Sequence, residues 1–309
     1  MTTVNGLVGK KDVQVVKEAK YMATYIIGDI HGCFDEWISL KERIELMDKD
    51  AKFIFVGDII DRGPKTMEMI KWAMENITPE GKYQMILGNH EYEKINWWNA
   101  YIVERDGLMN EIRKRHRENN NRIMDYRDYE PDDYDFSSVM SSNGLGDAEV
   151  EEIINFFRQL PVYKELWVDC SAKKNGKQHF IIVHASYPKE CMNKDETFSK
   201  SSIKIPKKAT IKQTRIVNMN IDNIVWERYY FSRSELKRTK VVHGHTPTIS
   251  RDLIVRQFWV KPGQVAINEN DINIDCGCVF SDYMNSNLCA FRLEDMSPFY
   301  LHDLEEMRV

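Results

Sequence analysis

The chain has 309 residues, of which 42% are hydrophobic, and a formal net charge of −5 at pH 7. This length and composition suffice for one large hydrophobic core or two modest ones, and therefore for a globular enzyme. Because the net charge is negative, there is no global basic field, and we expect no nucleic acid among the main partners. No run of about 18 apolar residues occurs, and the N-terminus lacks the apolar stretch of a signal peptide, so the sequence predicts a cytoplasmic protein without a membrane partner.

Residues 23–90 repeat one pattern, in which an apolar run, a polar turn with glycine and a helical period follow one another. Helices are expected over 34–46 and 66–77, and a third apolar run begins at residue 83 and ends before Asn89. Alternating strands and helices predict a largely buried sheet with its ligands beyond the carboxyl ends of the strands. The apolar helical faces are expected to contain Phe34, Trp37 and Ile38 in the first helix, and Met67, Ile70, Ala73, Met74 and Ile77 in the second.

The segment from about residue 95 to residue 149 differs from its surroundings in charge. A basic cluster precedes an acidic tract, and we interpret the segment as a charged helical insertion in a single domain of residues 1–309. Because it follows His90 closely, it is a candidate lid that selects the substrate, with Trp97 and Trp98 stacking on a base or an aryl group. The alternative is a peripheral decoration whose tryptophans pack on the sheet edge. The basic cluster consists of Arg113, Lys114, Arg115 and Arg117.

The remaining elements follow from periodicity. A helix is expected over 149–161, with Val150, Ile153, Ile154 and Phe157 on one face. A hairpin over 166–186 is expected to turn near Asn175 and Gly176. The last third alternates apolar and polar residues around turns, which predicts strands within 240–247, 264–280 and 287–295.

Histidines cluster at the ends of the expected strands. Five of the eight lie in short polar blocks: GDIHG at 28–32, GNHE at 88–91, VHAS at 183–186 and HGHTP at 243–247, and a further block, GDIIDRG at 57–63, contributes carboxylates. Carboxylate, imidazole and amide oxygen groups together suit divalent ions of intermediate hardness such as Mn, Fe, Zn or Co. The blocks therefore predict a metal site at one edge of the sheet.

In this order, the blocks resemble the signature of the calcineurin-like metallophosphoesterase superfamily. DRG at 61–63, WER at 226–228 and INIDCGCVF at 272–280 narrow the resemblance to the phosphoprotein phosphatase branch, in the bacterial and phage form that also contains diadenosine tetraphosphate hydrolases. The resemblance implies an α/β (α+β) fold, a metallophosphoesterase-type β-sandwich flanked by helices, with a metal site at the strand carboxyl ends.

The resemblance also implies a ligand set for two divalent ions, with Mn expected first and Fe, Zn or Co as alternatives. Asp29 and His31 would bind the first ion, and Asp58 would bridge both. A hydroxide bridging the two ions would attack phosphorus. The second ion would be completed by Asn89, His184 and His245.

The same resemblance implies the residues that assist the reaction. His90 is the expected general acid and Asp61 the carboxylate that orients it. Arg62 and Arg228 are expected to hold phosphate oxygens, since a planar guanidinium suits that geometry. Two further residues, His243 and Asp275, are candidates for a supporting role, with packing and turn capping as the respective alternatives.

These residues are compatible with three functions. The one we expect is a serine/threonine protein phosphatase-like phosphomonoesterase, a phosphoric monoester hydrolase. The alternative is a dinucleoside polyphosphate (diadenosine tetraphosphate) pyrophosphohydrolase. Both need the same metal ligands, so the expected partner is a phosphorylated protein or a nucleotide. The third is an inactive binding scaffold, against which the complete ligand set and His90 argue.

Overall fold

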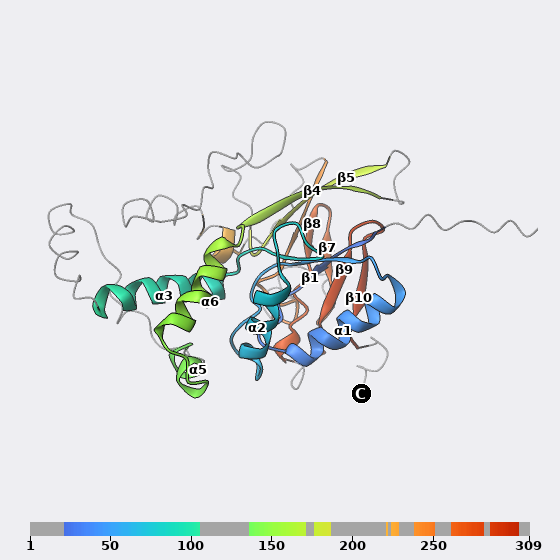
Figure 1. Cartoon of the computed structure of the whole chain (residues 1–309). Helices are drawn as coiled ribbons and strands as arrows, with labels where there is room; N and C mark the ends of the chain where they lie inside the picture. Colours follow the sequence, from blue (N-terminus) through green and yellow to red (C-terminus); the bar gives the residue numbers. More distant parts are fainter. Residues whose placement is uncertain are drawn as a thin grey trace, which may run out of the picture.

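The computed structural model describes residues 22–105, 136–170, 176–186, 221, 224–228, 238–250, 261–280 and 285–302. Within these ranges the chain forms two five-stranded sheets that pack face to face, with helices on the outside (Figure 1). The expected β-sandwich flanked by helices is therefore confirmed. In this part of the chain, no helix is both long and apolar enough to cross a bilayer.

The first sheet has the order β10-β9-β1-β2-β3. Strands β1 (Thr24–Ile27), β2 (Lys52–Phe55) and β3 (Tyr83–Met85) are parallel and form part of the largely buried sheet that the alternating pattern predicted. Helices α1 (Phe34–Met47) and α2 (Thr66–Asn76) connect them. On the other side of β1, strands β9 (Cys289–Arg292) and β10 (Ser297–Tyr300) pair antiparallel.

The second sheet has the order β4-β5-β6-β8-β7. It contains the expected hairpin, in which β4 (Tyr163–Asp169) and β5 (Lys177–Val183) are antiparallel. Strands β5, β6 and β8 are parallel, so their carboxyl ends meet at one edge. The three remaining strands are β6 (Thr239–His243), β7 (Ala266–Asn268) and β8 (Asp271–Asn273).

Successive side chains along each strand point to opposite faces of the sheet. Ile26 and Ile54 of the first sheet pack with Phe180 and Ile182 of the second in the core between the sheets. Their sequence neighbours, such as Ile27, point instead toward the helices. Since a strand directs successive side chains to opposite faces, both faces of β1 and β2 are buried.

Helix α2 differs in one respect from its predicted apolar face. Met67, Ile70 and Ala73 are buried, but Met74 is 37% exposed and was wrongly assigned to this face. Met69, which the prediction omitted, is fully buried. The buried stripe follows steps of three and four residues from Thr66 through Met69, Ile70 and Ala73, and Met74 lies beyond its margin.

Helix α3 (Asn89–Arg105) begins inside the GNHE block and extends into the expected insertion. It packs against α6 (Asp147–Gln159), whose buried residues Val150, Ile153, Ile154 and Phe157 are the predicted set. A shorter helix, α5 (Phe136–Ser142), precedes α6 (Figure 1).

Trp98 lies in this helix contact, with 1% of its surface exposed and its indole N–H donated to Glu151. The expectation that Trp98 stacks on a substrate is therefore wrong, because the ring is part of the hydrophobic core. Trp97 is partly buried against the same core. The rest of the insertion, residues 106–135 with the basic cluster, lies outside the described residues.

Candidate active site

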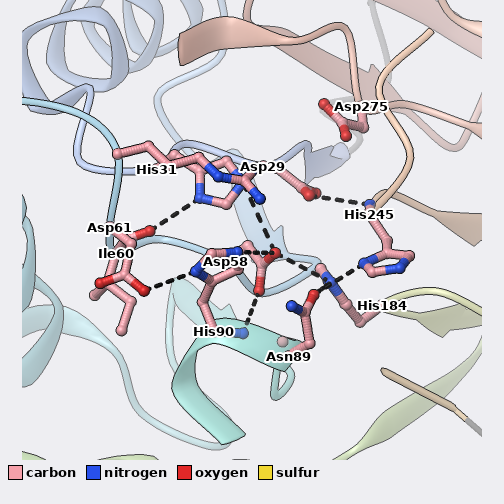
Figure 2. Close-up of polar contacts among 12 residues, drawn as sticks. Asp29, His31, Asp58, Ile60, Asp61, Asn89, His90, His184, His245 and Asp275 are labelled. Atoms are coloured by element: carbon pink, nitrogen blue, oxygen red, sulfur yellow. Dashed lines mark hydrogen bonds and ion pairs between the residues drawn. The ribbon is translucent and has the colours of Figure 1, made fainter. Parts of the chain in front are cut away.

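Most of the predicted site residues follow strands of both sheets, either in loops or, for Asn89 and His90, at the start of α3. Figure 2 shows aspartate, histidine and asparagine side chains gathered around Asp58. Seven non-glycine residues of the described chain have positive φ, and five of these are site residues. Positive φ is costly for such residues and persists only where the surroundings enforce it. The site loops are therefore held in strained turns that aim successive side chains inward. The five are His31, Asp58, Asp61, Arg62 and His245.

Glycine at position 244 permits a close approach between the two sheets at the site. A Cβ atom on Gly244 would lie 2.0 Å from Asp29 Oδ1. The missing side chain lets the His243–His245 loop approach Asp29, whose Oδ2 accepts the backbone N–H of His245 at 3.0 Å.

Asp58 occupies the centre of the cluster (Figure 2). Its Oδ2 lies 3.8 Å from His31 Nε2, 3.3 Å from His184 Nε2 and 3.9 Å from His90 Nε2. Two groups of potential metal ligands share it: one with His31 and His90, the other with His184 and His245. This central place matches the bridging position expected for Asp58.

Asn89 joins the two histidines of the second sheet. Its Oδ1 lies 2.8 Å from His184 Nε2 and 2.9 Å from His245 Nδ1. His184 donates its other ring N–H to the carbonyl oxygen of Val56 at 2.8 Å. A carbonyl oxygen can only accept, so Nδ1 carries a proton and Nε2 faces the cluster.

His31 has the same arrangement. Its Nδ1 donates to the carbonyl oxygen of Ile60 at 2.9 Å, and its Nε2 faces inward, where it accepts from the guanidinium of Arg62 at 2.8 Å. Arg62 therefore lies at the site, as expected, and contacts a nitrogen that a metal ion would take over. Arg228 is exposed, and its positive charge contributes to lowering the pKa of His245.

His90 and Asp61 form a close pair. His90 Nδ1 donates to Asp61 Oδ2 at 2.7 Å, and the backbone N–H of His90 binds Asp58 Oδ1 at 3.0 Å. Both side chains are buried. The imidazole therefore turns Nε2 toward Asp58, which is the orientation that a general acid beside the cluster requires.

The two candidate supporting residues lie at the margin. His243 Nε2 lies 3.3 Å from Asp271 Oδ2, within the second sheet. This contact favours the packing alternative for His243. Asp275 Oδ1 accepts the backbone N–H of Gly277 at 3.0 Å, which is the turn-capping alternative. Asp275 nevertheless lies on the side of His245 and Asp29 (Figure 2).

Burial and mutual charge set the protonation of the cluster. Burial, together with the charge of His90, lowers the pKa of His31 to about 3. Burial, together with the charge of His184, lowers the pKa of His245 to about 2. Although burial raises the pKa of Asp58, the charges of His184 and His90 hold it well below its usual range. Neutral His31 and His245 and anionic Asp58 are therefore in the forms that bind metal ions. His184 differs, because burial lowers its pKa but the charge of Asp58 and the hydrogen bond with it raise that pKa to about 9, so binding of an ion would release a proton from it.

Glu91 is a site residue that sequence reasoning missed. It is fully buried, and its carboxylate accepts the backbone N–H groups of Asp58 and Ile59, each at 2.9 Å, and of Gly88 at 3.1 Å. It therefore joins the loop after β2 to the start of α3. The signal available in the sequence was Glu91 itself, the charged residue that ends the GNHE block.

The residues present fit a pair of divalent ions. Asp29 Oδ1 and His245 Nε2 are buried polar atoms without a hydrogen-bond partner in the described structure. Burial and the charge of Asp275 raise the pKa of Asp29, and burial raises the pKa of Asp275 to about 6. A cation would relieve the electrostatic cost of these crowded buried carboxylates and satisfy the two orphaned atoms.

A family model described as calcineurin-like phosphoesterase matches residues 22–267, which contain every cluster residue described above except Asp275. The chain belongs to the calcineurin-like phosphoesterase family. Its sandwich fold is the one that the resemblance implied.

Curated proteins similar to part of this chain have the name symmetrical bis(5'-nucleosyl)-tetraphosphatase. The chain is 40% identical over 81 residues to a symmetrical bis(5'-nucleosyl)-tetraphosphatase of Methylobacillus flagellatus, covering 26% of this chain and 28% of the relative. It is 34% identical over 99 residues to the enzyme of that name from Buchnera aphidicola, covering 31% and 34%. The matched stretches thus span about a third or less of these relatives.

Solved phosphatases align over most of the chain at low identity. A cold-active protein-tyrosine phosphatase of a psychrophilic Shewanella species has 15% identity and a TM-score of 0.49, with 91% of this chain and 80% of that chain covered. A protein serine/threonine phosphatase from Saccharomyces cerevisiae has 12% identity and a TM-score of 0.47, with 92% and 80% covered.

Proposed function

We propose that this family member is a metal-dependent hydrolase that cleaves a phosphoanhydride bond of dinucleoside polyphosphates. The observation that carries the hydrolytic part is the convergence of His31, His184 and His90 on the carboxylate of Asp58. The tetraphosphatase names of the curated relatives support the substrate class.

Two divalent ions, held by Asp29, His31, Asp58, Asn89, His184 and His245, would supply Lewis acidity and lower the pKa of a water nucleophile. The protein's own groups do the rest. Arg62 and Arg228 offer planar donors to the non-bridging oxygens of phosphate, where charge accumulates during displacement. His90 presents Nε2 to the departing oxygen and gives it a proton, while Asp61 holds the other ring nitrogen at 2.7 Å.

A phosphomonoesterase acting on phosphoserine or phosphothreonine is the second candidate, and the pair of His90 and Asp61 is the observation that favours it. Proton donation helps most when the leaving oxygen is strongly basic, as a serine alkoxide is. The phosphate that leaves from an anhydride is less basic and needs that proton less. A well-built acid therefore suits monoesters at least as well as anhydrides.

A direct comparison of substrates decides between the two candidates. The Mn-loaded enzyme should turn over diadenosine tetraphosphate with a kcat/KM at least about tenfold above that for phosphoserine peptides, a difference of about 1.4 kcal/mol in transition-state binding. The opposite order would establish the phosphomonoesterase. If neither substrate is hydrolysed while two metal ions are bound, the hydrolase proposal itself is wrong.

A further inference from the structure

Lys94 contacts the same carboxylate oxygen as the expected general acid. Its Nζ lies 2.8 Å from Asp61 Oδ2, and His90 Nδ1 lies 2.7 Å from that same atom. Lys94 follows His90 by four residues on α3, so the two side chains share one face of the helix. The side chain of Lys94 is only 12% exposed.

The carboxylate of Asp61 receives hydrogen bonds from these two donors, His90 and Lys94. Its Oδ1 is buried without a hydrogen-bond partner in the described structure, whereas its Oδ2 contacts both His90 and Lys94. Although burial raises the pKa of Asp61, the hydrogen bond from His90 and the charge of Lys94 lower it, and the carboxylate stays ionised. A buried carboxylate with a neutral imidazole as its partner would be poorly compensated, and the ammonium group supplies the opposite charge.

This geometry differs from that of a lysine that binds substrate. The ammonium group of Lys94 is already paired with a carboxylate that is 3% exposed. Moving it to a phosphate would leave the buried carboxylate of Asp61 with His90 as its remaining partner in the described structure. The ion pair also limits the rotamers of Asp61, and through them the plane of the His90 ring.

We propose that Lys94 is a positioning residue of this active site, which fixes the Asp61 carboxylate so that His90 holds Nε2 toward Asp58 and the leaving group. The 3.9 Å separation of His90 Nε2 and Asp58 Oδ2 is the geometry that this contact maintains. The inference rests on the proposed hydrolytic function and adds a lysine to the pair of His90 and Asp61.

The test compares three variants by steady-state kinetics. Lys94→Met removes the charge, Lys94→Arg retains it, and Lys41→Met is the matched control, because Lys41 pairs with Glu45 at the same distance of 2.8 Å on α1. On phenyl phosphate, which has a basic leaving group, Lys94→Met should lower kcat about tenfold with KM unchanged, within the benefit of general acid catalysis. On 4-nitrophenyl phosphate the loss should be under about twofold, since little proton donation is needed there. Lys94→Arg should recover most of the rate, and Lys41→Met should match the unsubstituted enzyme.

A double-mutant cycle tests whether Lys94 acts through Asp61. If Lys94 acts through Asp61, Lys94→Met should cost little further activity in an Asp61→Asn background. Fully additive losses, equal losses on both esters or a raised KM at constant kcat would each overturn the positioning role.

One readout does not depend on turnover. In the nitrogen NMR spectrum of His90, the Nδ1–H tautomer hydrogen-bonded to Asp61 should persist in Lys94→Arg and Lys41→Met and be lost or mixed in Lys94→Met. An unchanged His90 signal in Lys94→Met would overturn the proposal even if no ester or anhydride proved to be a substrate. Failure of the proposed function alone would leave that spectral difference in place.

Discussion

The carboxylate of Glu91 accepts the backbone N–H of Asp58 at 2.9 Å, so a helix residue holds the peptide that carries the central carboxylate of the site. Glu91→Gln would turn an amide NH₂ toward at least one of the three N–H groups that the carboxylate now accepts. A buried donor left without an acceptor costs about 1–3 kcal/mol, which urea unfolding should detect. Metal affinity should fall about tenfold or more, because residues that orient ligands have effects of that size.

Glu149→Gln is the control for that variant. Glu149 also accepts a backbone N–H, that of Gly146 at 3.0 Å, but at an exposed helix start. It should change stability by less than about 1 kcal/mol and leave metal affinity unaltered. Equal effects of the two substitutions would show that Glu91 has no special relation to Asp58.

His90→Asn should keep the metal content near that of the unsubstituted protein and slow substrates with basic leaving groups about 100-fold to 10,000-fold, with a far smaller effect on activated aryl esters. The reason is the orientation of His90, whose Nδ1 donates to Asp61 Oδ2 at 2.7 Å and whose Nε2 faces Asp58. Rates on esters of graded leaving-group basicity, with metal analysis of the same samples, measure this. His302→Asn, at an exposed histidine, is the control. A uniform loss across the series would contradict proton donation by His90.

Chelation should abolish hydrolysis, and Mn should restore it, because the donors present suit divalent ions. It should also lower the thermal midpoint, since the proposed ligands come from both sheets and bound ions would join them. At a metal concentration of about 100 times Kd, the linkage amounts to about 2.7 kcal/mol. Differential scanning calorimetry with and without chelator measures the shift, and Asp58→Asn should show little of it. Full activity in metal-stripped protein would refute the mechanism.

Trp98→Ala should lower the free energy of unfolding by about 3–5 kcal/mol, because a large buried ring is removed from the contact between α3 and α6. KM for any substrate should be unchanged. Trp167→Ala, at a tryptophan that is 62% exposed, should cost less than about 1 kcal/mol. A raised KM in Trp98→Ala at constant stability would restore the stacking role that burial argues against.

The carboxyl group of Glu45, on α1, should make the free energy of unfolding depend on pH. Burial raises its pKa, but hydrogen bonds from Lys41, Lys82 and Tyr83 lower it from 4.5 to about 2. A carboxyl whose folded pKa is depressed stabilises the fold above its unfolded pKa and loses that contribution as the pH falls toward the folded pKa. The stability advantage over Glu45→Gln should therefore shrink between about pH 6 and about pH 3 in urea titrations. A stability advantage over Glu45→Gln that grows as the pH falls would contradict this prediction.

Periodicity and spacing predicted strands β1 to β3 and the buried face of α6, because those elements have strong local patterns. The polar blocks predicted which side chains meet, because carboxyl ends of parallel strands share an edge. Glu91 and Lys94 escaped prediction for one reason. Both depend on α3 starting at Asn89, whereas the sequence suggested a strand end followed by a charged insertion. Once that helix is known, the spacing of four residues between His90 and Lys94 becomes a signal.

The pairing of β1 with β9 has a consequence for how the chain reaches this structure. Tyr25 lies opposite Arg292, so a central strand of the first sheet receives its second neighbour from the other end of the described chain. Such distant pairings slow folding, because a long loop must close before the contact forms. Until then, β1 presents an unpaired apolar edge. We therefore expect the newly synthesised chain to be most prone to aggregation before β9 emerges from the ribosome, even though Asp29, Asp58 and Asn89 are made early.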